Sequence, residues 1–331
     1  MDWCWKEAIR ETVKKKKKPL GKSTPWAWVF ELVHGCNLRC GHCSCRLLEP
    51  GKYSFMDRET WRNGWGVLNE ISPHSRVDIC LAGEPTLHPH IVQYLRMARK
   101  ICPTAQIQIT TNGTMLRTGR VVYSELLEAG ANIIYTDMYG PQEEFRQLAK
   151  ASGFPWYEYY DALEGAPSPW TYHGPDLKMI VLQEQPENWP KSRFKAGLMG
   201  TWYNHLDWEA AARFGLSPVI KPLTRRCNQP FIYVPVHVDG SYLLCCQDNW
   251  GETAGLFGNV HSGVVGFKKY WFGKEMQIIR GRLRNKNRKD TSYCSRCCIT
   301  FSRCDYIYWK HDPLTKFWDG SNWASIEAGE E

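Results

Sequence analysis

Apolar runs and amphipathic runs alternate along the first two thirds of the chain, and this order limits the folds open to it. Apolar runs of four to eight residues favour strands, and apolar residues at helical spacing favour helices. The expected strands are 28–33, 77–81, 107–110, 132–136, 156–160 and 178–182, and the expected helices are 58–70, 90–100, 121–128 and 142–151. Strands joined by single helices run parallel with right-handed crossovers. We therefore expect an α/β fold whose sheet curls into a full or partial barrel.

Three loops at the ends of the first three strands carry most of the chemically useful side chains. Their sequences are HGCNLRCGHC at 34–43, AGEPTLHP at 82–89 and TTNGT at 110–114. Reactive groups in parallel α/β sheets gather at the carboxyl ends of the strands. We therefore expect the three loops to meet at one mouth.

Cysteine is the residue type that points to metal. The 331 residues include 14 cysteines, and a chain without an apparent secretory signal more often uses clustered thiols for metal than for disulfides. Cys36, Cys40 and Cys43 form a C-x3-C-x2-C pattern, in which three thiolates can hold a four-iron cluster and leave one iron open. Zinc is also compatible with this loop if a fourth ligand is added. The candidates for that ligand are His34, His42 and Cys45.

Seven of the 14 cysteines lie beyond residue 217, where the composition changes. Cys227 and Cys245 flank a segment whose Asp239-Gly240 pair is typical of a hairpin tip, and Cys294 and Cys297 follow as a C-x2-C pair. Two ligands from the first region and two from the second would enclose a cluster completely. A zinc ribbon uses similar pairs. The cysteines left without an assigned partner are Cys246, Cys298 and Cys304, which are candidates for alternative ligands, for packing, or for a hydrogen donor to a substrate radical.

These motifs together resemble a known family. CNLRCGHC after the first strand, with the Gly83-Glu84 turn after the second, resembles the radical S-adenosylmethionine (radical SAM) superfamily. The stretches CNQPFIYVPVHVDGSYLLCCQD, LFGNV and CSRC resemble the SPASM and Twitch extensions of such enzymes. The resemblance implies a partial (β/α)6 barrel followed by a small α+β cysteine-rich domain. We expect a basic arm at 1–24, the barrel at 25–216, the extension at 217–310 and a tail at 311–331.

The resemblance also implies cofactors and their ligands. S-adenosylmethionine is expected on the open iron of a [4Fe-4S] cluster held by Cys36, Cys40 and Cys43, where its cleavage yields a 5′-deoxyadenosyl radical. The residues implied to contact this cofactor are His42, Ala82, Gly83, Glu84, Asn112, Thr136 and Asp137. The residues implied to hold one auxiliary [4Fe-4S] cluster are Cys227, Cys245, Cys294 and Cys297. A second auxiliary cluster is not expected, because the later cysteines of the full SPASM pattern are missing.

Substrate class is implied only by analogy with the family. Many such enzymes modify ribosomally made peptides, and we predict this activity, with a separate peptide-recognition protein as a partner because only 35 residues precede Cys36. The alternative is a radical dehydrogenase that acts on a sugar, cyclitol or nucleotide and uses the auxiliary cluster as electron acceptor. A reducing protein such as flavodoxin or ferredoxin is expected to supply electrons in either case.

Charge and hydropathy exclude other classes. The net charge of +8 includes five lysines at 14–18, and removing them leaves 8 − 5 = +3. Such a block is usually a solvated arm, so nucleic acid is not the expected partner, although a zinc-stabilised nucleic-acid-binding protein is the alternative of another class. No run approaches the ~18 apolar residues of a membrane span, and a cytoplasmic protein is expected.

Overall fold

The computed structural model describes residues 24–25, 27–38, 45, 48–138, 158–161, 177–182, 224, 227, 229–248, 250–295 and 297, and for 133, 135, 137–138, 158–161 and 177–182 it gives the backbone alone. The predicted helix at 142–151, the lysine block at 14–18 and the predicted tail at 311–331 lie outside the described residues.

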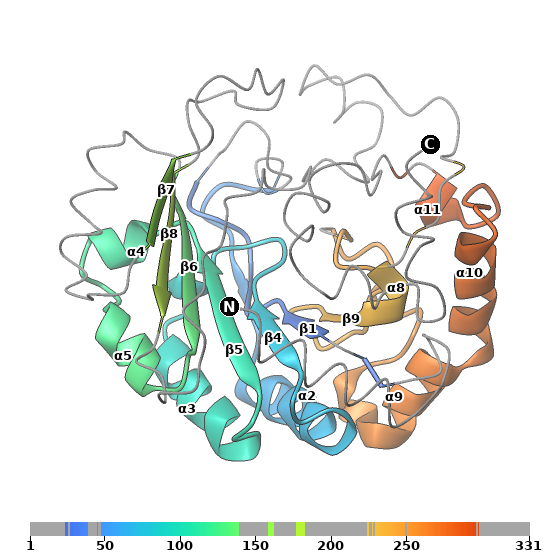
Figure 1. Cartoon of the computed structure of the whole chain (residues 1–331), viewed down its shortest axis with the longest axis horizontal. Helices are drawn as coiled ribbons and strands as arrows, with labels where there is room; N and C mark the ends of the chain where they lie inside the picture. Colours follow the sequence, from blue (N-terminus) through green and yellow to red (C-terminus); the bar gives the residue numbers. More distant parts are fainter. Residues whose placement is uncertain are drawn as a thin grey trace.

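A seven-stranded sheet organises the described part of the chain, with strand order β7-β8-β6-β5-β4-β1-β9 (Figure 1). Its strands are β1 (Ala27–Phe30), β4 (Arg76–Ile79), β5 (Gln106–Thr111), β6 (Ile133–Met138), β7 (Glu158–Asp161), β8 (Leu177–Leu182) and β9 (Tyr233–Val236). A second, antiparallel sheet pairs β2 (Val33–His34) with β3 (Ser54–Phe55). The helices of the barrel half are α2 (Arg58–Ile71), α3 (Ile91–Ile101), α4 (Thr114–Arg117) and α5 (Tyr123–Glu128), with a 3-10 turn η2 (Pro85–Leu87). The later helices are α8 (Gln229–Ile232), η3 (Val260–Ser262), α9 (Gly263–Phe272), α10 (Lys274–Arg284) and α11 (Ser292–Ser295).

The predicted parallel arrangement is confirmed for most of the sheet and wrong for one strand. β1, β4, β5 and β6 pair in parallel. β8 instead runs antiparallel to both β6 and β7. The sequence between β7 and β8 carries no helical pattern, and antiparallel strands need no crossover helix. The rule that strands joined by a single helix run parallel therefore did not apply to the connection between β7 and β8.

The carboxyl-terminal half contributes a strand to the same sheet. β9 pairs in parallel with β1, from Ala27 opposite Tyr233 to Phe30 opposite Val236. The hairpin predicted beyond it is confirmed: Val236 bridges Tyr242, the amide of Gly240 donates to the carbonyl of His237, and Gly240 has a φ of +85°. A positive φ is a conformation that glycine adopts without strain. The turn that sequence reasoning placed at Asp239-Gly240 thus follows the edge strand of the main sheet.

The core forms where the helices cover the outer side of the sheet. Helices α5, α3, α2 and α9 follow one another around it (Figure 1). The Phe30 ring on β1 packs with Trp28 on the same strand and with Trp61 and Trp65 on α2, and the Phe30 and Trp65 rings stack with 5.5 Å between their centroids. A Cβ at Gly64 would lie 2.6 Å from the Phe30 ring, so glycine lets α2 approach β1. These three tryptophans are fully buried core residues.

Asp57 begins α2, and its replacement by alanine is expected to lower the free energy of unfolding by about 1 kcal/mol. Its carboxylate accepts from the amide of Thr60 at 2.8 Å and from the Thr60 hydroxyl at 2.8 Å. The amide hydrogen bond is the main reason that the pKa of Asp57 lies below its usual value. The stabilisation is therefore present above the ordinary aspartate pKa and is lost as the pH falls through the lowered pKa.

Urea unfolding followed by circular dichroism at several pH values measures this effect. Asp57→Asn is the matched control, because asparagine keeps the capping acceptor but does not titrate. An Asp57→Ala variant as stable as the wild type at neutral pH would contradict the capping role.

Candidate active site

The loop that leads to Cys36 is hydrogen-bonded to the turn after β4. Gly35 donates its amide to the carbonyl of Ala82 at 3.0 Å, and the amide of Glu84 donates to the carbonyl of Gly35 at 3.0 Å. A Cβ on Gly83 would lie 1.9 Å from the carbonyl oxygen of Val33, so only glycine fits there. The predicted convergence of the first two loops is confirmed, and the Ala82-Gly83-Glu84 turn sets the position of the segment that carries Cys36.

Glu84 joins the second loop to the third. Its carboxylate is buried, and one oxygen accepts from the amide and hydroxyl of Thr86 and from the hydroxyl of Thr111 at 2.6 Å. The other oxygen accepts from the amide of Asn112 at 2.7 Å. Burial raises the pKa of Glu84, while these hydrogen bonds oppose the rise. The side chain connects the loops after β4 and β5, and its predicted contact with a cofactor stays a prediction.

Asn112 lies directly against the first cysteine of the motif. Its amide nitrogen donates to Asn37 Oδ1 at 3.0 Å and contacts Cys36 Sγ at 3.4 Å. Its side-chain oxygen Oδ1 accepts from the backbone amide of Thr114 at 2.9 Å, and Gly113 follows with a φ of +74°. The Asn-Gly pair is therefore both a turn and a neighbour of Cys36. A donor at this sulfur would stabilise a thiolate that holds iron.

Among the other residues predicted for this mouth, the structure describes the side chain of Thr136 but not those of Asp137, Cys40, His42 and Cys43. The buried hydroxyl of Thr136 lies 2.9 Å from the hydroxyl of Tyr123. Asp137 is placed on β6, but its side chain is not among those described. Cys40, His42 and Cys43 lie outside the described residues. The cofactor roles of these residues stay predictions.

Three of the four cysteines predicted for the auxiliary cluster lie near one another, and the amide of the fourth, Cys297, donates to the carbonyl of Cys294 at 3.2 Å. Cys227, Cys245, Cys294 and Cys297 are all buried. Burial raises the pKa of the Cys294 thiol, and the charges of Cys227 and Cys245 raise it further, which places these sulfurs near one another. The metal that these four cysteines would hold stays a prediction at this point.

A buried cation that the sequence did not single out lies beside this set. Arg288 is 1% exposed, and its Nη1 lies 3.6 Å from Cys297 Sγ. Its charge also acts to lower the pKa of Cys294. Arg288 therefore offsets negative charge that thiolates would place in this interior. In the sequence, Arg288 lies among other basic residues, and no pattern marks it as the one that would be buried.

Of the three cysteines without an assigned partner, the structure describes Cys246 alone. Cys246 Sγ donates to Gln229 Oε1 at 2.9 Å, beside Cys245. This contact is compatible with packing and leaves the ligand and hydrogen-donor roles as predictions. Cys298 and Cys304 lie outside the described residues.

Comparisons with known proteins agree with this geometry. A family model described as the radical SAM superfamily matches residues 30–167, and a SPASM model, described as an iron-sulfur cluster-binding domain, matches residues 227–298. The chain is a radical SAM enzyme with a SPASM extension. Radical SAM chemistry requires S-adenosylmethionine and a [4Fe-4S] cluster, and the SPASM domain binds auxiliary iron-sulfur clusters. These matches favour an iron-sulfur enzyme over the alternative of a zinc-stabilised nucleic-acid-binding protein.

Two solved structures resemble the enzyme over most of its length. BtrN in complex with AdoMet and 2-DOIA shares 18% identity and a TM-score of 0.57, covering 85% of this chain and 97% of that one. Selenomethionine BtrN in an open conformation shares 17% identity and a TM-score of 0.54, covering 87% and 98%. This likeness confirms the predicted radical SAM fold. No curated protein matches the chain, and none of the helices described has the length and apolar character of a membrane span.

Proposed function

We propose that this radical SAM enzyme is a dehydrogenase that oxidises an alcohol group on a small polar substrate. The observation that carries the proposal is that buried Cys227 and Cys245 lie near enough to Cys294 for their charges to raise its pKa, while Cys297 follows Cys294 in the next turn. A single auxiliary cluster resembles the arrangement in small-molecule dehydrogenases of the family. The near full-length likeness to BtrN, a structure solved with AdoMet and 2-DOIA, supports the same choice.

The overall chemistry balances with these cofactors. Oxidation of an alcohol to a carbonyl removes one hydrogen atom from carbon, one proton from oxygen and one electron. When bound, S-adenosylmethionine with its cluster supplies the radical that takes the hydrogen atom, and the auxiliary cluster supplies an acceptor for the electron. We propose Cys36, Cys40 and Cys43 as ligands of the first cluster.

The described residues of the enzyme prepare these two sites. Gly83 and Glu84 fasten the Cys36 segment to the loops after β4 and β5, and Asn112 donates toward Cys36. We propose that Cys227, Cys245, Cys294 and Cys297 hold the auxiliary cluster, with Arg288 offsetting its negative charge. Their burial keeps water away from the metal centres.

Substrate turnover tests the proposal directly. Reduced, cluster-loaded enzyme is incubated with S-adenosylmethionine and panels of cyclitols, sugars and nucleosides, and in parallel with short peptides. We expect 5′-deoxyadenosine to form together with a small product that has lost two hydrogen atoms. Deuterium placed on the oxidised carbon should appear in 5′-deoxyadenosine. Modified peptides without any oxidised alcohol would instead favour the peptide-modifying activity, which stays a prediction with its recognition protein and its flavodoxin or ferredoxin donor.

Replacement of Cys294 by alanine is expected to remove the auxiliary cluster and uncouple the reaction. Iron should fall from about eight to about four atoms per chain, since two four-iron clusters become one. Cleavage of S-adenosylmethionine should persist while product formation is lost. Anaerobic iron and sulfide analysis with product quantification measures both effects.

Cys246→Ala is the matched control, because Cys246 lies beside the site but pairs with Gln229. It should keep the full iron content. Loss of iron from this variant, with none lost from Cys294→Ala, would contradict the proposed ligand set.

A further inference from the structure

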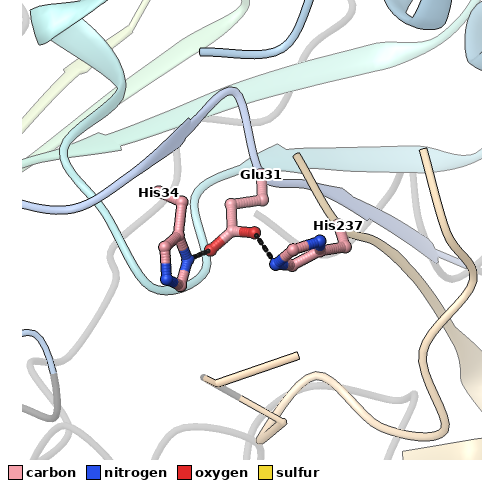
Figure 2. Close-up of side chains that lie close together, drawn as sticks. All are labelled: Glu31, His34 and His237. Atoms are coloured by element: carbon pink, nitrogen blue, oxygen red, sulfur yellow. Dashed lines mark hydrogen bonds and ion pairs between the residues drawn. The ribbon is translucent and has the colours of Figure 1, made fainter. Parts of the chain in front are cut away.

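A carboxylate and two imidazoles meet where the two halves of the enzyme join (Figure 2). Glu31 directly follows β1, and His237 directly follows β9. Because β1 and β9 are parallel neighbours with Phe30 opposite Val236, both residues emerge at the same edge of the sheet. His34 arrives from β2, two residues before Cys36. The sequence placed His34 among candidate metal ligands but gave no sign of the other two.

The three side chains point at one another. Glu31 Oε1 lies 2.8 Å from His34 Nδ1, and Glu31 Oε2 lies 3.3 Å from His237 Nε2. One ligand atom from each residue lies within 4.8 Å of the other two. Glu31 is 1% exposed, whereas the imidazole side chains of His34 and His237 are 20% and 16% exposed. The group therefore has a buried carboxylate at its base and two rings that reach toward solvent.

The backbone holds this arrangement before any ligand binds. The amide of Glu31 donates to the carbonyl of Val236 at 2.9 Å. The amide of Val238 donates to Glu31 Oε2 at 3.1 Å. These bonds fix Glu31 against the segment that carries His237, which lowers the ordering cost of a ligand that uses both.

A second carboxylate and a glycine prepare His237 for a ligand. His237 Nδ1 lies 3.0 Å from Asp239 Oδ1, which directs the other ring nitrogen toward Glu31. A carboxylate behind a histidine is the usual arrangement around metal-binding imidazoles. A Cβ on Gly251 would lie 2.8 Å from His237 Nε2, so glycine keeps the space beside this nitrogen free of a side chain.

We propose that Glu31, His34 and His237 form a binding site for one divalent transition-metal ion of the zinc class. Two histidines and one glutamate are a ligand set of zinc sites that keep an open coordination position, and imidazole with carboxylate also suits iron(II). The ion would replace the protons shared in the two histidine–glutamate hydrogen bonds. It would link the first strand of the barrel half to the strand contributed by the extension.

Zinc binding to the cluster-loaded enzyme tests this site. Enzyme with measured iron and sulfide is incubated anaerobically with Zn²⁺, freed of excess metal by gel filtration and analysed for zinc and by zinc X-ray absorption. We expect one additional zinc per chain, with nitrogen and oxygen ligands at about 2.0–2.2 Å and no sulfur at about 2.3 Å. The absorption spectrum separates this site from zinc lodged among cysteines.

Variants assign the bound ion to the cluster. Glu31→Gln and His237→Gln should lose the stoichiometric zinc, and Asp239→Asn, which leaves the three ligands in place, should weaken binding about 10- to 100-fold. His74→Gln replaces an exposed histidine and should bind as the wild type does. Unchanged iron content and melting temperature without zinc show that each variant is folded. Absence of stoichiometric zinc, sulfur ligation, or equal binding by His237→Gln would overturn the proposal.

Discussion

Replacement of Gly83 by alanine is expected to lower 5′-deoxyadenosine formation at least about 100-fold, the scale of loss when a catalytic group is misplaced by about 1 Å. The added Cβ would lie 1.9 Å from the carbonyl oxygen of Val33 and 2.9 Å from that of Gly35. Both contacts are with backbone, so no side chain can rotate away. The turn after β4 must therefore separate from the segment that carries Cys36. Chromatographic quantification of 5′-deoxyadenosine measures the loss.

Gly66→Ala is the matched control for this substitution. Gly66 lies within α2, and a Cβ there would meet nothing within 4 Å. Alanine should leave turnover unchanged and stabilise the helix by up to about 1 kcal/mol. If Gly83→Ala cleaved S-adenosylmethionine at the wild-type rate, the close packing between the two loops would be incorrect.

Replacement of Cys36 by alanine is expected to abolish cleavage of S-adenosylmethionine. The first cluster would lose one of three proposed protein ligands, and the Asn112 amide would lose its sulfur contact. The auxiliary site does not use this residue, so about four irons per chain should remain. Iron analysis and 5′-deoxyadenosine assays under anaerobic reduction give both values.

Cys102→Ala provides the comparison for loss of a cysteine in general. Cys102 is fully buried after α3, and its sulfur donates to the carbonyl of Pro73 at 3.3 Å, at the amino-terminal side of β5. The variant should keep both clusters and its cleavage activity. Normal cleavage by Cys36→Ala would remove Cys36 from the ligand set.

Local patterns carried most of what the sequence revealed about the site. Cys36, the Gly83-Glu84 turn and the Asn112-Gly113 pair each lie in a short segment after a strand, and the parallel neighbours β1, β4 and β5 bring these segments together. Apolar spacing also placed the ends of α2 and α3 to within one residue. Both kinds of inference need only residues close in the chain or a rule for adjacent strands.

Contacts between segments far apart in the chain could not be predicted from the sequence. The pairing of Glu31 with His237 depends on β9 joining β1, which no local pattern encodes. The placement of Arg288 beside Cys297 depends on how α10 and the following turn fold back. The direction of β8 depends on a connection without helical periodicity. In each case the deciding contact joins elements whose relative position is set by the whole fold.

The position of β9 bears on how this enzyme can be divided. The four residues of β1 are all buried, and β9 supplies the partner for their outer backbone groups. A fragment that ends at residue 216 would lack β9 and leave β1 as an exposed, apolar edge strand. Such an edge can pair with strands of other molecules and cause aggregation. Modular exchange of the SPASM segment would therefore require a donor that brings its own covering strand.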